Sequence, residues 1–185
     1  SCTKEDEVNI QEVDDICTKM NDINFMKFCY TKYDVNNDSK VTMTEASAVY
    51  EMDISGQGIR SLTGIEYFTN LKIFACSFNE LTSLDVSNNV NLTRLSCGYN
   101  KLTSLNISNC INLTELSCTS NQLTSLDINH CTNLKELDFQ SNLLTSIDVS
   151  KCVNLIDING TSNLLTSLDL SKCVHLIEFS CGHNH

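Results

Sequence analysis

The feature that most constrains this chain is an internal repeat of 21 residues, which occurs five times in succession. Each copy begins with the letters LTS, and the last copy ends at His185, the last residue given. The copies start at Leu81, Leu102, Leu123, Leu144 and Leu165. A looser copy, one residue longer, covers 59–80. A repeat of this length predicts a solenoid, in which each copy forms one coil and buries its apolar side against its neighbours.

Within each copy, apolar and polar residues alternate over a short segment. Leu95 and Cys97 alternate with Arg94, Ser96 and Gly98. This period of two is typical of a β-strand and places the first two side chains inside and the other three outside. A second segment, SLDVS from residue 83, alternates in the same way and predicts another extended stretch on the opposite side of the coil.

The recurring pattern LxxLxCxxN, as at 92–100, resembles the leucine-rich repeat family in a short bacterial form where Cys takes a core position. The resemblance covers 59–185. It implies an α+β fold, namely a leucine-rich-repeat solenoid of about six coils with one short parallel strand per 21-residue coil. The resemblance also implies that these strands line the concave side.

Two columns of asparagine follow the same period. An Asn amide both donates and accepts hydrogen bonds, so it can satisfy backbone groups in a buried turn. We therefore predict structural roles for both columns. The first column contains Asn79, Asn100, Asn121, Asn142, Asn163 and Asn184, and the second contains Asn70, Asn91, Asn112, Asn133 and Asn154.

Eight of the eleven cysteines also fall into two columns. One column contains Phe139 and Gly160 as well, which indicates packing rather than sulfur chemistry, because a buried thiol behaves as a small hydrophobe. Stacked parallel strands would hold the Cβ atoms about 5 Å apart, too far for unstrained disulfides. No CxxC pair offers a zinc site. We predict reduced core thiols at Cys76, Cys97, Cys118 and Cys181 and at Cys110, Cys131, Cys152 and Cys173.

Residues 1–58 differ in composition, with 12 acidic residues and five lysines. Their apolar residues recur with helical spacing, which predicts three helices: one with Val13, Ile16, Cys17 and Met20 on one face, one over 23–33 and one over 43–52. A solenoid needs a cover over its first coil. We therefore expect two parts, an acidic helical cap over 1–58 and the solenoid over 59–185.

Between the second and third predicted helices lies DVNNDSKVTMTE, residues 34–45. It resembles EF-hand and dockerin-type calcium loops, although Ser39 stands where Gly normally provides the turn. The resemblance implies a structural Ca²⁺ ion held by Asp34, Asn36, Asp38, the Lys40 carbonyl and Glu45. Alternatively, Thr42 and Glu45 form a capping box for the third helix, and the two interpretations can coexist.

The first residues, SCTKEDE, resemble the start of a mature bacterial lipoprotein and the surface-export signal of outer-membrane lipoproteins. The resemblance implies a lipid anchor on Cys2 and an exported protein on the cell surface. The alternative is an ordinary acidic terminus.

A net charge of −11 disfavours nucleic-acid binding, which requires a basic face. The four histidines lie at predicted turns or at the chain end, so we predict no catalytic site. The outward strand positions instead form an acidic stripe, which predicts a protein or peptide partner, cationic in character. We expect contacts from Phe78, Arg94, Tyr99, Glu115, Glu136, Asp138, Asp157 and Glu178.

A second acidic stripe is expected on the opposite side, and such a regular surface is also typical of a structural spacer without a specific ligand.

The last repeat carries no polar cap sequence. Its edge therefore predicts a cover, either a further region of the protein or a second copy. For a second copy we predict a weak homodimer through 165–185, in which two copies pair their strands about a two-fold axis.

Overall fold

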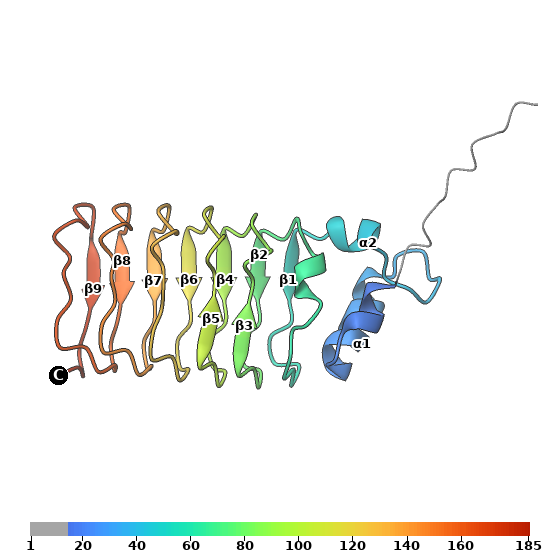
Figure 1. The fold of residues 1–185 in the computed structure, drawn as a ribbon, viewed down its shortest axis with the longest axis horizontal. Helices are drawn as coiled ribbons and strands as arrows, with labels where there is room; N and C mark the ends of the chain where they lie inside the picture. The colour runs from blue at the N-terminus through green and yellow to red at the C-terminus, as the bar shows by residue number, and fades with distance from the viewer. Residues whose placement is uncertain (1–14) are drawn as a thin grey trace, which may run out of the picture.

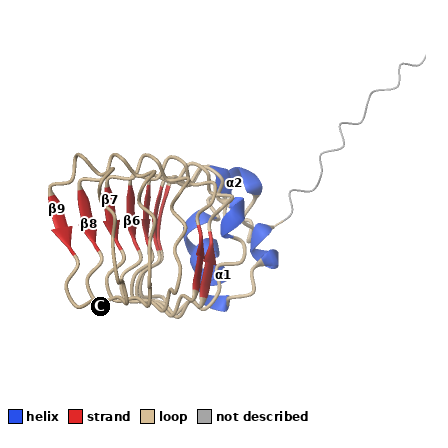
Figure 2. Cartoon of the chain, turned by 60° about the vertical axis from the view of Figure 1, so that its left-hand side comes forward, coloured by secondary structure: helices blue, strands red, loops and turns tan. Residues whose placement is uncertain are grey.

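In the computed structural model, which describes residues 15–185, the repeats form a solenoid with a helical cap at its N-terminal end (Figure 1). The main sheet has seven parallel strands in the order β1-β2-β4-β6-β7-β8-β9, and it forms one side of the solenoid (Figure 2). Their bounds are Glu51–Asp53, Ile73–Ala75, Arg94–Ser96, Glu115–Ser117, Glu136–Asp138, Asp157–Asn159 and Glu178–Ser180. The expected leucine-rich-repeat solenoid is confirmed.

The opposite side of the coils carries a much smaller sheet. Strands β3 (Ser83–Asp85) and β5 (Ser104–Asn106) pair in parallel, and the SLD-type segments of later coils run extended without forming strands. The second extended stretch predicted for each coil is therefore a strand in two coils only.

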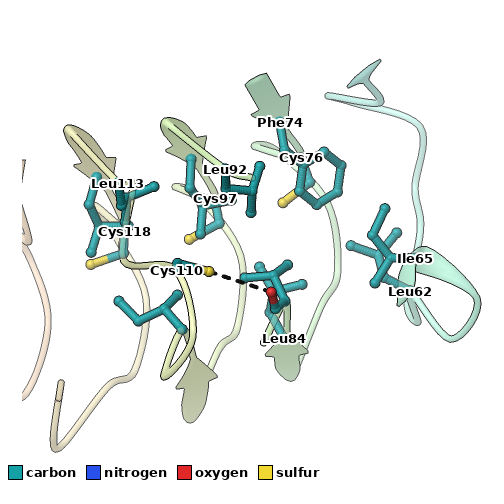
Figure 3. Packing of buried hydrophobic residues seen from close by; sticks show 14 of the residues in the cluster. Leu62, Ile65, Phe74, Cys76, Leu84, Leu92, Cys97, Cys110, Leu113 and Cys118 are labelled. Carbon is teal, nitrogen blue, oxygen red and sulfur yellow. Dashed lines mark hydrogen bonds between the residues drawn. The ribbon is translucent and has the colours of Figure 1, made fainter. Parts of the chain in front are cut away.

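The core of the solenoid is built of columns of leucine and cysteine. The strand leucines and the column cysteines are buried from Phe74 to Ile158, and Figure 3 shows Cys76, Cys97 and Cys118 in one row from three successive coils. The column cysteines are free, as expected. At the last coil the core becomes exposed, because within residues 15–185 no further coil packs against β9: Phe179 is 49% exposed.

The buried asparagine column ties neighbouring coils together. Nδ2 of Asn121 donates to the carbonyl oxygens of Cys118 (3.0 Å) and Cys97 (3.1 Å), one in its own coil and one in the coil before. Its Oδ1 accepts from the backbone N–H of Leu102 at 2.9 Å. The same pattern recurs at Asn100, Asn142, Asn163 and Asn184.

The second asparagine column is half-buried at Asn70 and Asn91 and exposed in the later coils, and it makes one hydrogen bond per coil. Asn112 Nδ2, for example, donates to the carbonyl of Val90 at 3.1 Å, and Asn133 Nδ2 donates to that of Ile111 at 2.9 Å. Both asparagine columns are thus structural, as predicted.

Asn89 stands at the head of the second cysteine column for a local reason. In the first coil the chain forms the 3-10 helix η2 (Ile65–Tyr67). The carbonyls of Ile65 and Phe68 each accept one backbone hydrogen bond there, from Phe68 N–H and Leu71 N–H, and each can accept a second. Nδ2 of Asn89 donates to the carbonyls of Ile65 (2.9 Å) and Phe68 (3.0 Å). Later coils lack this turn, so a cysteine suffices there.

The N-terminal cap contains the 3-10 helix η1 (Ile16–Lys19) and the helices α1 (Ile23–Tyr33) and α2 (Met43–Ser47). The first predicted helix is therefore one short 3-10 turn in the described residues, and Val13 lies outside them. The third is shorter than predicted, because the backbone of Tyr50 joins the sheet: its carbonyl accepts from Lys72 N–H at 2.8 Å. Met52 is buried in strand β1 instead of a helix.

Strand β1 pairs with β2 in register, Glu51 opposite Ile73. The sheet thus begins within the segment that we expected to be a purely helical cap. Helix α1 packs on the first coil through aromatic rings, with the centroids of Tyr33 and Phe68 5.5 Å apart. No helix of the described residues is long and apolar enough to cross a membrane.

Candidate functional site

The outer side of the seven-stranded sheet, which the resemblance predicts to be concave and which we call the concave face, carries a strongly acidic surface. The middle residue of each strand points into the core, and the two flanking residues point outward. Along the seven strands these outward positions hold seven acids and one base, Arg94. The acids are Glu51, Asp53, Glu115, Glu136, Asp138, Asp157 and Glu178. Glu51 and Asp53 were missed in the sequence because β1 lies outside the recognisable repeats.

Four of these acids are direct neighbours across the sheet. The register places Glu115 opposite Glu136, Glu136 opposite Asp157, and Asp157 opposite Glu178. Adjacent strands lie about 4.8 Å apart, and like charges directly opposite destabilise a sheet. The acidic stripe predicted from the sequence is therefore one continuous column.

Only the first member of the stripe has a cationic partner among residues 15–185. Arg94 forms an ion pair with Glu115, and this contact raises the pKa of the Arg94 guanidinium. The remaining two ion pairs within those residues join Glu80 to Arg60 (3.3 Å) and to Lys101 (3.6 Å), away from the strands. The carboxylates from Glu136 onward are thus free to meet a cation.

A shallow depression of about 350 Å³ collects most of the predicted contact residues. It is lined by Arg94, Glu115, Glu136, Asp138 and Asp157, together with the serines and leucines of the same strands. Glu178 lies on the next strand, outside the depression. A cationic segment laid across β4 to β8 would contact all five.

Phe78 and Tyr99 lie at the edge of this surface, in the turns that follow β2 and β4. Their rings are stacked, with centroids 4.4 Å apart and planes 7° from parallel. Phe78 is 61% exposed and Tyr99 is 52% exposed. The sequence predicted contacts from both residues, but it did not indicate the stacking.

The predicted calcium loop is folded by its own side chains. Asp34 accepts from the backbone N–H groups of Asp38 (3.1 Å) and Ser39 (3.0 Å). Ser39 adopts a left-handed conformation, with φ of 68°, so it makes the turn for which glycine is usual. Asn36 also lies in this loop, where its Oδ1 accepts from the N–H of Asp38 at 3.0 Å.

The Glu45 carboxylate serves the loop and helix α2 together. Its Oε2 accepts from the N–H and the hydroxyl of Thr42, both at 2.9 Å, which is the predicted capping box. Its Oε1 accepts from Val35 N–H at 2.9 Å. The hydrogen bonds from Thr42 and Val35 lower the pKa of Glu45. In the part of the chain that the structure describes, no three acidic, histidine or cysteine side chains are grouped for a metal ion.

The buried thiols of the cysteine columns have low chemical reactivity. Burial, followed by the negative charge of Asp85, raises the pKa of the Cys110 thiol to about 11, and burial raises that of Cys152 to about 12. Burial also raises the pKa values of Cys97 and Cys118 well above the ordinary value. Since the thiolate is the reactive form, these side chains are poor nucleophiles and metal ligands at neutral pH.

Known proteins share this architecture. A family model for leucine-rich repeats in two copies matches residues 111–152. A comparison with curated proteins gives no significant match. The solved functional domain of InlJ from Listeria monocytogenes, described as including a cysteine ladder, is 28% identical with a TM-score of 0.80 and covers 93% of this chain and 43% of its own.

Two further structures show the same fold. An internalin, InlF, from Listeria monocytogenes is 22% identical with a TM-score of 0.63 over 92% of this chain and 59% of its own. A leucine-rich-repeat protein of Leptospira interrogans is 23% identical with a TM-score of 0.59 over 77% of this chain and 51% of its own. The chain thus spans less than two thirds of each of these three structures. The repeats, the fold and these similarities show that the chain forms a leucine-rich-repeat solenoid similar to those of bacterial proteins, with repeats of about 21 residues.

Proposed function

We propose that the chain is a non-catalytic protein-interaction module, which binds a cationic protein or peptide on its concave face. The observation that carries the proposal is the column from Glu115 to Glu178, in which carboxylates oppose one another on adjacent strands. A cationic partner would relieve their mutual repulsion. Solenoids of this type offer their concave surface for binding in general.

The test compares two acidic surfaces of the same molecule. In one variant Glu115 and Glu136 become Gln, and Asp157 becomes Asn. In the matched control, three exposed acids of the opposite side, Asp127, Asp148 and Asp169, become Asn. Both variants remove three charges. The first should weaken the capture of cationic peptides and flatten its dependence on salt, and the second should change the affinity much less.

Two results would count against the proposal. Equal losses in both variants would show that the net charge, rather than the concave face, attracts the peptides. Failure of the unmodified protein to bind across a broad panel of cationic peptides and surface proteins would favour the alternative function, a structural spacer.

We further propose that the protein is exported and anchored in the outer membrane at the cell surface through a lipid on Cys2. This residue lies outside the described part of the structure, and the proposal rests on the sequence SCTKEDE. Mass spectrometry of the mature protein from its native host tests it. A diacylglyceryl group on the Cys2 thiol supports the anchor, whereas an unmodified Cys2 refutes it.

The exposed edge of β9 motivates the weak homodimer through 165–185. All three residues of this strand are exposed, and Ile177 next to it is 80% exposed. We propose that a second copy covers this edge by strand pairing. Light scattering at high micromolar concentration should then show dimers, and Ile177→Lys should remove them. A strict monomer would overturn the proposal.

A further inference from the structure

The stacked rings of Phe78 and Tyr99 occupy a backbone position where the fold does not require an aromatic residue. Each coil makes a left-handed turn here, and the position holds glycine, serine or histidine in the other coils. The φ values of the whole column lie between 53° and 69°, at Gly56, Phe78, Tyr99, Ser120, Ser141, Ser162 and His183. Bulky side chains are disfavoured in this conformation, so the two rings add backbone strain and expose apolar surface without stabilising the core.

Both outer faces of the stack are open. Gly56 precedes Phe78 in the column, because both residues make the same hydrogen bond to the next coil. The N–H of Gly56 donates to the carbonyl of Ser77, and the N–H of Phe78 donates to the carbonyl of Gly98, each at 3.0 Å. A Cβ placed on Gly56 would meet no atom within 4 Å. On the other side Tyr99 is followed by Ser120, whose side chain is too short to cover a ring.

The spacing of the coils suits a further flat group. Adjacent coils repeat at about 4.8 Å, and the two rings are 4.4 Å apart. A planar group laid over Gly56 or Ser120 would therefore continue the stack at the same separation. The column presents two empty places of this kind.

The surrounding charge decides which planar group fits. The outward strand positions carry seven acids and one base, so the groups drawn to this face are cationic. The two cations closest in sequence to Tyr99 are already paired: Lys101 lies 3.6 Å from the carboxylate of Glu80, and Arg94 forms an ion pair with Glu115. Among cationic side chains, arginine is planar and stacks on aromatic faces, whereas the lysine ammonium is a compact point charge.

We propose that the Phe78–Tyr99 stack recognises an arginine side chain of a cationic segment that lies along the concave face. This inference rests on the proposed function, because it presumes that such a segment binds there. Its added content is selectivity: the acidic strands attract any cation, and the stack distinguishes arginine from lysine.

The experiment uses end-blocked tetra-arginine and tetra-lysine peptides, which carry equal charge, and measures their affinities by titration at low ionic strength. The unmodified protein should bind tetra-arginine about three- to tenfold more tightly than tetra-lysine. The double variant Phe78→Ser with Tyr99→Ser should bind both peptides with the affinity that the unmodified protein has for tetra-lysine. Serine occupies the same backbone conformation at Ser120 and Ser141, so this variant should fold.

The control variant Ile111→Ser removes an exposed apolar side chain that is off the concave strands, and it should keep the preference for arginine. NMR spectra of the bound peptide give a second readout. The δ protons of arginine should shift upfield through the ring currents of the stack, and this shift should vanish in the double variant.

The possible results separate the two proposals. Equal binding of the two peptides by the unmodified protein, or a preference for arginine that survives in the double variant, would overturn the stack inference and leave the acidic concave site standing. Binding of neither peptide would overturn both.

Discussion

The ring of Phe139 occupies the space that a side chain at Gly160 would need: a Cβ on Gly160 would lie 2.5 Å from Cζ of Phe139. Both residues belong to a column that otherwise holds cysteine, one coil apart. A large residue in one coil therefore compensates for a missing side chain in the next, which explains why the column departs from cysteine at two successive positions.

This relationship predicts strong coupling between the two positions. Gly160→Cys should clash with the ring, and Phe139→Cys should leave a cavity and lower the free energy of unfolding by about 2–4 kcal/mol. The double variant should recover much of the loss, because it restores the cysteine column. Chemical denaturation of the four proteins gives the coupling energy, and simple additivity of the two single losses would contradict the prediction.

The buried column thiols, from Cys76 to Cys173, should be inert in the native protein. Burial keeps the pKa of Cys110 at about 11 and that of Cys152 at about 12, so both stay protonated at pH 7. Alkylation should be slow in buffer and fast in denaturant. Mass spectrometry that found native disulfides within either column would refute the packing account.

The two asparagine columns should differ in energy. Asn121→Ala removes the acceptor of the buried Leu102 N–H, and it removes one of the two asparagine donors to each of the carbonyls of Cys97 and Cys118. The free energy of unfolding should fall by about 2–4 kcal/mol. The control Asn133→Ala loses one exposed hydrogen bond and should cost about 1 kcal/mol or less. Equal losses would show that burial does not set the difference.

Asp22 should hold the cap on the solenoid. Its carboxylate caps α1 through Asn24 N–H (2.9 Å) and accepts from Arg60 N–H (2.7 Å) in the first coil. Asp22→Ala should therefore lower the free energy of unfolding by about 1–2 kcal/mol. Asp127→Ala, which removes an exposed acid with one local hydrogen bond, is the control and should cost less.

The contribution of Asp22 should also depend on pH. Burial alone would raise its pKa, but the N–H groups of Arg60 and of the α1 N-terminus hold the pKa below its ordinary value of 3.8. Since the folded pKa is the lower one, the stabilisation is complete above the unfolded pKa and is lost as the pH falls through the folded one. Asp22→Ala should abolish this part of the acid sensitivity; an unchanged profile between pH 5 and pH 2 would contradict the assignment.

Calcium binding by loop 34–45 stays a prediction. Millimolar Ca²⁺ should raise the melting temperature, and Asp34→Ala should abolish the rise, because Asp34 would be the first ligand of the loop. Mg²⁺ at the same concentration is the control for ionic strength. No difference between the two ions would leave Glu45 with its capping role alone.

The repeats made most of the fold predictable, because the residue types found at equivalent positions of successive repeats indicate whether that position is buried or exposed. Both asparagine columns, the cysteine packing and the helix over 23–33 follow from local pattern. Strand β1 could not be found in this way, since it is a strand only through its pairing with β2, far along the chain. The same non-local pairing ended the third predicted helix early.

The site was predictable in part for the same reason. The outward residues from Arg94 to Glu178 are fixed by the repeat register, whereas Glu51 and Asp53 depend on the pairing of β1. The ring stacking of Phe78 on Tyr99 depends on the left-handed turn, which no residue type in that column specifies by itself.

The asparagine of each turn forms hydrogen bonds only within its own coil and with an adjacent coil. The coils are therefore equivalent units that add length to the solenoid one at a time. Duplication of 123–143 would move Glu178 away from the Phe78–Tyr99 stack by one strand spacing, about 4.8 Å, and would leave both ends chemically unchanged. The length of the concave face thus changes by one coil at a time, through the number of repeats in the gene. Gain or loss of a repeat by recombination can fit this face to a partner of different length without bending the solenoid.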